Sequence, residues 1–316
     1  MAELRYTIII PMRHYRADEY ALQGLRDVPP PGPAQILVVE GDHPARQRNA
    51  ALSKAQGELV IFLDNDCHIS TNFWAKLEAA FARPEVQIVG GPALLRQDAS
   101  PLEQIFQALL THTLIVGTIS SRYSARGIFR PARQTELILC NLTARRSIFT
   151  QIGLLSSELY PNEENEWLDR AHAAGAGAFY DPQLQVFRPQ RATLGQLGHT
   201  LIRYGMGRTR QFQVSGWHPT FHQFLPLMVI MTFWALFACH LEIVFIVLWL
   251  VASAIIALSC DPGLRAWQRI VAGLTAPAVP LTYSVGQLIG WVALVFPSPA
   301  LTAPITVRDE HGQPVA

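Results

Sequence analysis

The chain carries little charge for its length. Of its 316 residues, 16% are Asp, Glu, Lys or Arg and half are hydrophobic, against roughly 25% charged residues in an average soluble domain. The formal net charge is only +1. The chain therefore lacks the large excess of positive charge that is typical of nucleic-acid-binding proteins, and we expect no nucleic-acid partner. The length allows about two domains.

Cysteine pairs and a secretory signal are also missing. The four cysteines form no Cys-x-x-Cys pair and are interpreted as buried free thiols in a reducing compartment; they are Cys67, Cys140, Cys239 and Cys260. The first apolar run, Tyr6–Ile10, is too short for a signal peptide and ends at Pro11. We therefore expect the N-terminal domain to remain in the cytosol.

Up to about residue 214, strand patterns alternate with helix patterns. Strands are predicted at Tyr6–Ile10, Gln35–Val39, Leu59–Leu63 and Val86–Val89, and helices at Ala17–Leu25, Ala45–Lys54 and Asn72–Phe81. This alternation is typical of βαβ units and predicts an α/β domain with a mainly parallel sheet. Such sheets bind ligands at the carboxyl ends of their strands.

After Arg210 the composition changes, because only three basic residues follow. Three long apolar runs are found there: Phe224–His240, Ile243–Cys260 and Ile270–Phe296. A membrane-spanning helix needs about 20 apolar residues, so we predict about three transmembrane helices. The alternative is a core hairpin of a soluble domain, which rarely contains windows this long and apolar. The predicted domains are residues 1–214, 215–300 and a tail, 301–316.

Basic residues predict the orientation of these spans. Arg203, Arg208 and Arg210 precede the first run, and Arg265 and Arg269 separate the second from the third. Both groups belong on the cytoplasmic side, and three complete spans then leave the tail outside. The third run contains two prolines and three glycines, so it could instead be re-entrant.

The most informative stretch is Leu-Val-Ile-Phe-Leu-Asp-Asn-Asp-Cys at residues 59–67. Asp64 and Asp66 follow a buried strand and are one residue apart, so their side chains are expected on the same side. Adjacent carboxylates repel each other unless a divalent cation lies between them and a polyanionic ligand. Mg²⁺ or Mn²⁺ suits this role. The alternative is an ordinary turn, because turns readily recruit Asp.

The residues around this stretch resemble family 2 glycosyltransferases of the GT-A fold. The resemblance lies in Ile8-Ile9-Ile10-Pro11, in Val38-Val39-Glu40-Gly41, and in Ala45 to Leu52 followed by Ala55-Gln56-Gly57 and Asp-x-Asp. It implies that Asp66, with Asp64, holds the metal. It also implies that the donor, a nucleotide-diphospho-sugar, is bound by Pro11, Arg13, Glu40, Arg48, Asn49 and Asp64. Glu40 stands where the family usually has Asp.

Two later segments extend the resemblance. Asn141 to Gly153 is similar to the segment that precedes the acceptor site, and Asn162-Glu-Glu-Asn-Glu-Trp-Leu-Asp-Arg170 to the family's acidic helix start. Matching by position makes Glu164 the general base, with Glu163 beside it. Asn141, Glu166 and Trp167 are then expected on the acceptor side. The alternative is a simple capping run, because helix starts attract acids.

The segment before the first apolar run, Leu201-Ile-Arg-Tyr-Gly-Met-Gly-Arg208, resembles membrane-attached glucosyltransferases of bacterial exopolysaccharide synthesis, of the succinoglycan type. Arginine forks bind phosphate well, so Arg203 and Arg208 could close over the diphosphate. They could equally contact lipid headgroups. Family members often have a His near Phe187-Arg188-Pro189, sometimes as a metal ligand; this chain has Arg188.

These features together predict an inverting, metal-dependent glycosyltransferase of the bacterial inner membrane. Its catalytic domain is expected in the cytosol, with a lipid-linked or membrane-presented acceptor. Two alternatives stay open. One is a degenerate, membrane-anchored protein that binds a nucleotide sugar or a partner without catalysis. The other is a sugar nucleotidyltransferase, which would normally carry a Gly-rich loop after the first strand, where Pro11-Met-Arg-His-Tyr15 stands here.

Overall fold

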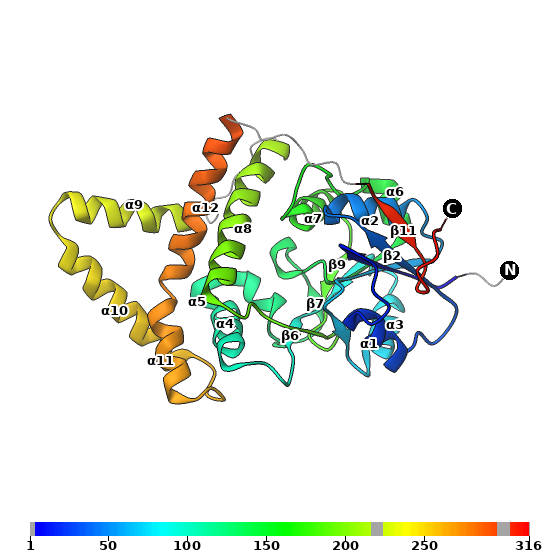
Figure 1. The fold of residues 1–316 in the computed structure, drawn as a ribbon, viewed down its shortest axis with the longest axis horizontal. Helices are drawn as coiled ribbons and strands as arrows, with labels where there is room; N and C mark the ends of the chain where they lie inside the picture. Colours follow the sequence, from blue (N-terminus) through cyan, green and yellow to red (C-terminus); the bar gives the residue numbers. More distant parts are fainter. Residues whose placement is uncertain (1–3, 216–223, 296–303, 316) are drawn as a thin grey trace. The chain divides into compact units, whose positions relative to one another are not determined.

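The computed structural model describes residues 4–215, 224–295 and 304–315 and contains two compact units. Unit 1 comprises Met1–Arg96, Ser121–Pro189 and Ala300–Ala316, and unit 2 comprises Gln97–Ser120 and Gln190–Pro299. Figure 1 labels their helices and strands. The predicted boundary between residues 300 and 301 lies outside the described residues.

Unit 1 is built on an eight-stranded mixed sheet with the order β11-β2-β1-β3-β8-β5-β9-β7. Its strands are β1 (Tyr6–Met12), β2 (Ala34–Glu40), β3 (Leu59–Leu63), β5 (Ile88–Gly90), β7 (Arg130–Pro131), β8 (Asn141–Arg145), β9 (Ala178–Tyr180) and β11 (Thr306–Arg308). β1 pairs in parallel with both β2 and β3, whereas β8 runs antiparallel to β3 and β5. The predicted α/β class is confirmed, with a sheet that is mixed rather than mainly parallel.

Helices cover both faces of this sheet because its central strands are apolar on both sides. In β3, Leu59, Ile61 and Leu63 face one core cluster, and Val60 and Phe62 face the other. The first cluster includes residues of α1 (Tyr20–Asp27) and α3 (Phe73–Phe81). The second includes residues of α2 (Pro44–Leu52), α6 (Arg146–Ile152) and α7 (Glu163–Ala173). This burial holds the carboxyl ends of the strands in place.

Gly57, just before β3, is required by close packing of the backbone. A Cβ atom at this position would lie 2.4 Å from the carbonyl carbon of Tyr6 in β1, which no real side chain tolerates. The Gly57 N–H donates to the Thr7 hydroxyl at 2.8 Å. The glycine therefore lets β3 enter the sheet directly beside β1.

A second, three-stranded sheet lies next to the predicted ligand-binding edge. Its order is β4 (His68–Ile69), β10 (Val186–Arg188) and β6 (Ala93–Leu95). β4 begins two residues after Asp66, and β10 pairs antiparallel with it through Phe187 and His68. The pairing therefore brings the end of β10 to the acidic turn.

The C-terminal residues belong to the sheet and do not form a separate tail. β11 pairs antiparallel with β2, with Val307 opposite Val39, and Val307 is buried. Unit 1 therefore includes chain from both before and after the apolar segment. The expectation of three complete spans with the tail outside is wrong, because an odd number of crossings would separate β11 from β2.

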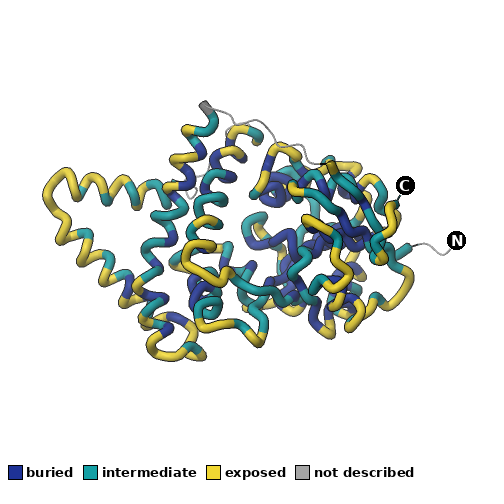
Figure 2. Tube along the Cα trace, in the orientation of Figure 1, coloured by how far each residue is buried: buried dark blue, intermediate teal, exposed yellow. Residues whose placement is uncertain are grey.

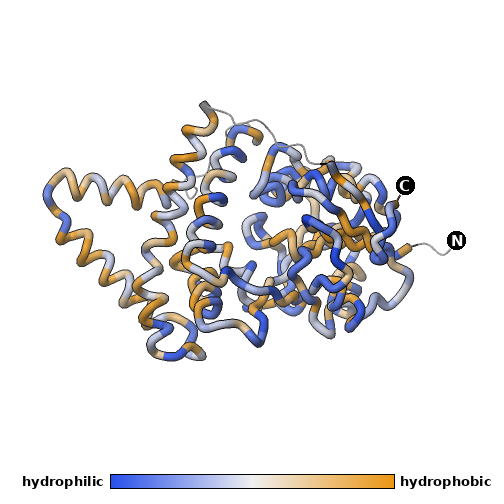
Figure 3. The backbone as a smooth tube through the Cα atoms, in the orientation of Figure 1, coloured by the Kyte–Doolittle hydropathy of each residue, from blue (hydrophilic) through white to orange (hydrophobic). Residues whose placement is uncertain are grey.

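Unit 2 is helical. Its helices are α4 (Pro101–Thr111), α5 (Thr113–Val116), α8 (Leu194–Val214), α9 (Leu225–Ala238), α10 (Glu242–Ser259), α11 (Ala266–Thr275) and α12 (Ala278–Val295). Figures 2 and 3 show α9 and α10 as helices that are both exposed and hydrophobic. Among the described residues, only Glu242–Ser259 is long and apolar enough to cross a membrane, and Pro226–Ala238 is a shorter apolar helix. The prediction of about three spans is therefore supported for one helix only.

The third apolar run is divided into two helices, α11 and α12. The break falls at Ala276 and Pro277, because proline cannot continue the hydrogen-bonding pattern of α11. The glycines of this run serve packing. A Cβ atom on Gly286 would lie 2.2 Å from the carbonyl oxygen of Ile202, and one on Gly205 would lie 2.2 Å from that of Tyr283. α8 and α12 thus lie in backbone contact within unit 2.

Candidate active site

The two predicted carboxylates lie in a tight turn directly after β3. The Cys67 N–H donates to the Asp64 carbonyl at 3.1 Å, so the strand ends at Leu63 and residues 64–67 turn. The expected orientation of Asp64 and Asp66 on the same side is observed, although a turn rather than strand alternation produces it. Their side chains are 26% and 32% exposed.

Arg188, at the end of β10, binds both carboxylates. Its Nη1 donates to Asp64 Oδ2 at 3.2 Å and its Nη2 to Asp66 Oδ2 at 2.9 Å. Burial opposes the charged form of Arg188, but the carboxylates of Asp66 and Asp64 outweigh it and hold the guanidinium pKa well above its ordinary value. A permanent cation therefore lies where the sequence predicted a divalent metal.

A second arginine, Arg48 on α2, links the acidic turn to the start of α7. Its Nη2 donates to Asp64 Oδ1 at 2.7 Å, and its Nη1 donates to Glu163 Oε1 at 3.0 Å. Arg48 is 4% exposed and Glu163 is 3% exposed. Two of the sequence-predicted regions, far apart in the chain, are thus joined by one buried side chain.

The acidic run at the start of α7 is held inside unit 1. It follows Asn162, whose φ of 85° is left-handed, a conformation that asparagine tolerates better than most residues. Glu163, Glu164 and Glu166 are all in the first helical turn and all buried. Glu163 pairs with Arg48, Glu164 Oε1 with Arg122 Nη1 at 3.3 Å, and Glu166 with Arg170. The three acids lie in the first turn, where a capping run would place them, and all three are buried and ion-paired.

Glu163 has an unusual protonation equilibrium. Burial, reinforced by the negative charge of Glu164, raises its pKa to about 7, although the Arg48 guanidinium acts in the opposite direction. Its Oε2 is buried and has no hydrogen-bond partner among the described residues. Glu163 therefore changes its charge near neutral pH, in the range where a general base operates best.

Glu164 is anchored by Arg122, which sequence reasoning missed. The Arg122 guanidinium also donates to Thr135 O at 2.7 Å and to Asn165 Oδ1 at 2.6 Å. These bonds hold the Arg122 guanidinium in the position from which it contacts the Glu164 carboxylate. Arg122 lies in a region without a recognisable motif, so only the folded structure shows its role.

Three of the predicted donor-binding residues lie at the ends of β1 and β2. Pro11 is buried in β1 opposite Val39, and Arg13 is exposed just after the strand. Glu40 ends β2, accepts from the Tyr15 N–H at 2.8 Å and forms an ion pair with Arg308 of β11. The Tyr15 N–H and Arg308 lower the Glu40 pKa. The ion pair with the C-terminal strand had no signal in the sequence.

Several predicted residues make contacts that stabilise the fold. Asn49 exchanges hydrogen bonds with the backbone of Leu155 at 2.7 and 3.1 Å. The Asn141 amide donates to Leu184 O at 2.7 Å, and the Trp167 indole donates to Gly153 O at 3.0 Å. Asn141 and Trp167 are 1% and 0% exposed, so these contacts give no support to an acceptor-side role.

The two arginines before the first apolar run lie on α8, which belongs to unit 2, whereas the acidic turn belongs to unit 1. Arg208 is buried and its Nη1 donates to Gln211 Oε1 at 2.8 Å. Arg203 is half-buried. Their closure over a diphosphate stays a prediction.

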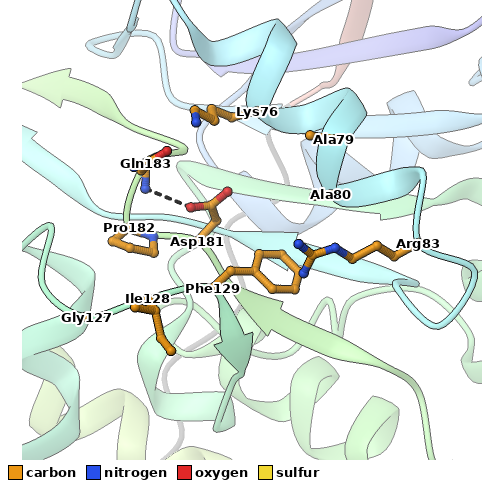
Figure 4. A pocket seen from close by; sticks show the side chains of 10 residues that line it. All are labelled: Lys76, Ala79, Ala80, Arg83, Gly127, Ile128, Phe129, Asp181, Pro182 and Gln183. Carbon is orange, nitrogen blue, oxygen red and sulfur yellow. Dashed lines mark hydrogen bonds between the residues drawn. The ribbon is translucent and has the colours of Figure 1, made fainter.

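A pocket of about 320 Å³ in unit 1 is separate from these carboxylates. Figure 4 shows Asp181 beside Phe129, with the Arg83 guanidinium over the Phe129 ring. The Arg83 Cζ lies 3.9 Å from the centre of that ring. The lining includes none of Asp64, Asp66, Glu163 and Glu164. This pocket therefore does not mark the candidate active site.

The residues at the acidic turn fit a divalent metal poorly. Both Asp64 oxygens and Asp66 Oδ2 already accept hydrogen bonds from guanidinium groups. Within the described part of the chain, no group of three or more His, Cys, Asp or Glu side chains could hold a metal ion. Arg188 occupies the position where the resemblance offers a histidine, and a buried cation there repels a second one.

Comparison with known proteins adds to what the α/β fold and the acidic turn indicate. Residues 21–153 match the family model described as Glycosyl transferase family 2. None of the curated protein sequences matches the chain. The matched segment includes Arg48, Asp64 and Asp66 and ends before α7.

One solved structure shares the fold over most of the chain. It is the mannosyltransferase PcManGT from Pyrobaculum calidifontis, in complex with GDP-Man and Mn²⁺, with a TM-score of 0.54 and 17% identity. The match covers 90% of this chain and 87% of that one. TarS from S. aureus has a TM-score of 0.42 and 12% identity, covering 72% of this chain and 47% of that chain. GalNAc-T7, solved with UDP, GalNAc and Mn²⁺, has a TM-score of 0.41 and 12% identity, covering 65% and 48%.

Proposed function

We propose that the protein is a glycosyltransferase that uses a nucleotide-diphospho-sugar as its donor. The observation that carries the proposal is a continuous series of ion pairs between the acidic turn and α7, formed by Asp66, Arg188, Asp64, Arg48 and Glu163. It joins the donor-binding motif to the candidate bases. The family match over residues 21–153 and the fold shared with PcManGT support it.

The reaction is a single displacement with inversion at the anomeric carbon. The acceptor oxygen forms a bond to that carbon while the bond from the carbon to the donor's diphosphate oxygen breaks. The nucleoside diphosphate leaves with the electron pair, and the proton of the acceptor hydroxyl passes to a carboxylate of the protein. Negative charge grows on the leaving diphosphate, so positive groups must lie close to it.

Glu164 is the base that the resemblance implies, and Glu163 is a second candidate. Each has one oxygen engaged by an arginine, Glu164 by Arg122 and Glu163 by Arg48. The other oxygen of Glu163 is buried without a hydrogen-bond partner among the described residues, and its pKa is raised to about 7. The negative charge of the adjacent Glu164 is one cause of the raised pKa of Glu163. Single glutamine variants separate the two assignments.

Membrane attachment through α9 and α10 completes the proposal. α10 exposes Ile243, Leu258 and most of the large apolar side chains between them, which is the composition of a lipid-facing helix. An enzyme held at a membrane meets a lipid-linked or membrane-presented acceptor. We place the catalytic unit on the cytosolic side of a bacterial inner membrane, with Arg203 and Arg208 as further candidates for diphosphate contact.

The return of β11 to unit 1 restricts how the helices enter the bilayer. Because β2 and β11 pair, the apolar segment must re-emerge on the side from which it entered. At 1.5 Å per residue, the 14 residues of α9 reach about 21 Å, less than the roughly 30 Å hydrocarbon core. We infer that α9 and α10 enter as a hairpin whose tip includes Cys239.

The tip can be located by thiol labelling, because Cys239 is exposed whereas Cys67, Cys140 and Cys260 are buried. In sealed inner-membrane vesicles, a membrane-impermeant maleimide should fail to label Cys239 from either side and should label it after detergent is added. Labelling from the cytosolic side alone would place the hairpin outside the bilayer. Cys239→Ser is the control that assigns the signal.

The proposed activity is tested with the detergent-purified full chain and a membrane lipid extract as acceptor source. Radiolabelled GDP-mannose and UDP-glucose are supplied in parallel, and transfer is measured as label extracted with the lipid. Transfer from one donor supports the enzyme. A donor that binds to folded protein without transfer or hydrolysis would instead support the degenerate binding protein.

A further inference from the structure

The acidic turn and Arg188 form one preorganised unit. The two terminal nitrogens of Arg188 donate to different carboxylates, at 3.2 Å to Asp64 and at 2.9 Å to Asp66. The Arg188 side chain is 17% exposed, so the guanidinium is largely shielded from water but still reachable. β10 holds it there through its pairing with β4, which begins directly after the turn.

The carboxylates at this position are already ion-paired without a metal. Arg188 pairs with Asp64 and Asp66, and Arg48 pairs with Asp64 and also with Glu163. A divalent ion would have to displace a guanidinium from Asp64, or bind next to one. The first option leaves a buried arginine unpaired and the second places like charges together, and both are unfavourable.

The chemistry of arginine suits a diphosphate. A guanidinium has five N–H donors in a planar fork and stays charged at every physiological pH. The two bonds to the aspartates use two of these donors, so the group can hold the carboxylates and a phosphate oxygen at the same time. Charge-assisted bonds of this kind are about twice as strong as neutral ones.

We propose that Arg188 contacts the donor's diphosphate through its remaining N–H donors, and that donor binding is independent of divalent metal. The inference rests on the proposed function, because it concerns the same donor site. In it, Asp64 and Asp66 orient Arg188 through its two ion pairs and do not coordinate a metal. The predicted requirement for Mg²⁺ or Mn²⁺ then does not apply to this chain.

The experiment measures binding of GDP-mannose and UDP-glucose to the purified full chain by isothermal titration calorimetry, with EDTA, Mg²⁺ or Mn²⁺. For the donor that binds, the Kd should change by less than about twofold between the three conditions. Direct titration with Mn²⁺, followed by its electron paramagnetic resonance signal, should show no saturable site at the acidic turn. A large rise in Kd when EDTA is added would show that binding needs a metal. It would overturn the inference but leave the proposed function standing.

Two variants make the test sharper. Arg188→Ala should weaken donor binding by about 30-fold or more, the cost of truncating a buried charge partner. Arg188→His offers an imidazole next to Asp64 and Asp66, and it should bind the donor more tightly with Mn²⁺ than with EDTA. Arg126→Ala, at an exposed position of the same unit, is the matched control and should bind as the wild type does.

Folding of each variant is checked by thermal unfolding before binding is measured. If Arg188→Ala does not fold, Arg188→His and the chelation experiment on the wild type still decide the question. Wild-type affinity retained in folded Arg188→Ala would refute the role of Arg188. Failure of every donor to bind folded wild type, with or without metal, would contradict the proposed function itself and the inference with it.

Discussion

The strands of unit 1 and the helices α9 and α10 of unit 2 are similarly apolar, but their surroundings are opposite. All five residues of β3 are buried, whereas only 11% of the apolar window in α10 is buried. Hydrophobic residues that the protein does not cover must be covered by something else. In unit 1, apolar strands position charged groups, and in unit 2, apolar helices form a surface suited to lipid.

The largest expected effect comes from the charged groups that unit 1 positions. Glu164→Gln should lower turnover by about 10²–10⁴-fold, the usual contribution of a general base, with donor Kd unchanged. Glu163→Gln is measured alongside, and the variant that loses more turnover identifies the base. Glu242→Gln, at the first residue of α10 in unit 2, is the control. A loss of turnover there would break the division of roles between the units.

Truncating an apolar side chain tests the two environments directly. Phe62→Ala removes a fully buried ring whose centre lies 6.0 Å from that of Phe149, and it should lower the free energy of unfolding by about 3–5 kcal/mol. Leu248→Ala, at a 53% exposed position of α10, should change it by less than about 0.5 kcal/mol in detergent. Denaturant unfolding followed by tryptophan fluorescence measures both. Equal losses would mean that α10 packs against protein.

The pH dependence of turnover and of the free energy of unfolding tests the protonation of Glu163 in unit 1. With a pKa of about 7, Glu163 must lose its proton to act as a base, so turnover should fall about tenfold per pH unit below 7 if it is the base. The free energy of unfolding has the opposite pH dependence to turnover. The folded state holds a proton that the unfolded state releases near its ordinary value of 4.5. The free energy of unfolding should therefore decrease as pH rises from about 4.5 through 7.

Glu163→Gln is the control for both pH profiles, because it cannot ionise. Its free energy of unfolding should vary less between pH 4.5 and 7 than that of the wild type. A variant profile that still declines as steeply as the wild type would show that a group other than Glu163 causes the decline.

The smallest effect is expected at the contact that brings the chain end back to unit 1. Arg308→Ala removes the ion pair with Glu40, whose partners are 28% and 20% exposed, and should lower the free energy of unfolding by about 1 kcal/mol or less. Chemical denaturation at low and high salt measures it, with the larger loss at low salt. Arg16→Ala, at an exposed pair with Asp18, is the matched control.

Local patterns in the sequence predicted much of unit 1, whereas contacts between distant segments could not be predicted. The apolar run of β3 and the turn at Asp64 depend on residues that are close in the sequence, so both could be predicted. The pair between Arg188 and Asp66 joins residues 122 positions apart and needs the pairing of β10 with β4. Arg122 gave no signal for the same reason. The prediction of about three spans is supported for one helix only, because hydropathy alone does not show where apolar runs break into shorter helices, as between α11 and α12.

The pairing of β11 with β2 also orders events during synthesis. The Tyr15 hydroxyl donates to Glu310 O across 295 positions, so this edge of the sheet stays open until residues 306–310 have been made. At roughly 5–20 residues per second, the segment of unit 2 between Gln190 and Pro299 occupies the ribosome for several seconds or more. During that time β2 is an unprotected edge strand, a site prone to wrong pairing. The sheet of unit 1 is therefore completed only after the apolar helices of unit 2 have been synthesised.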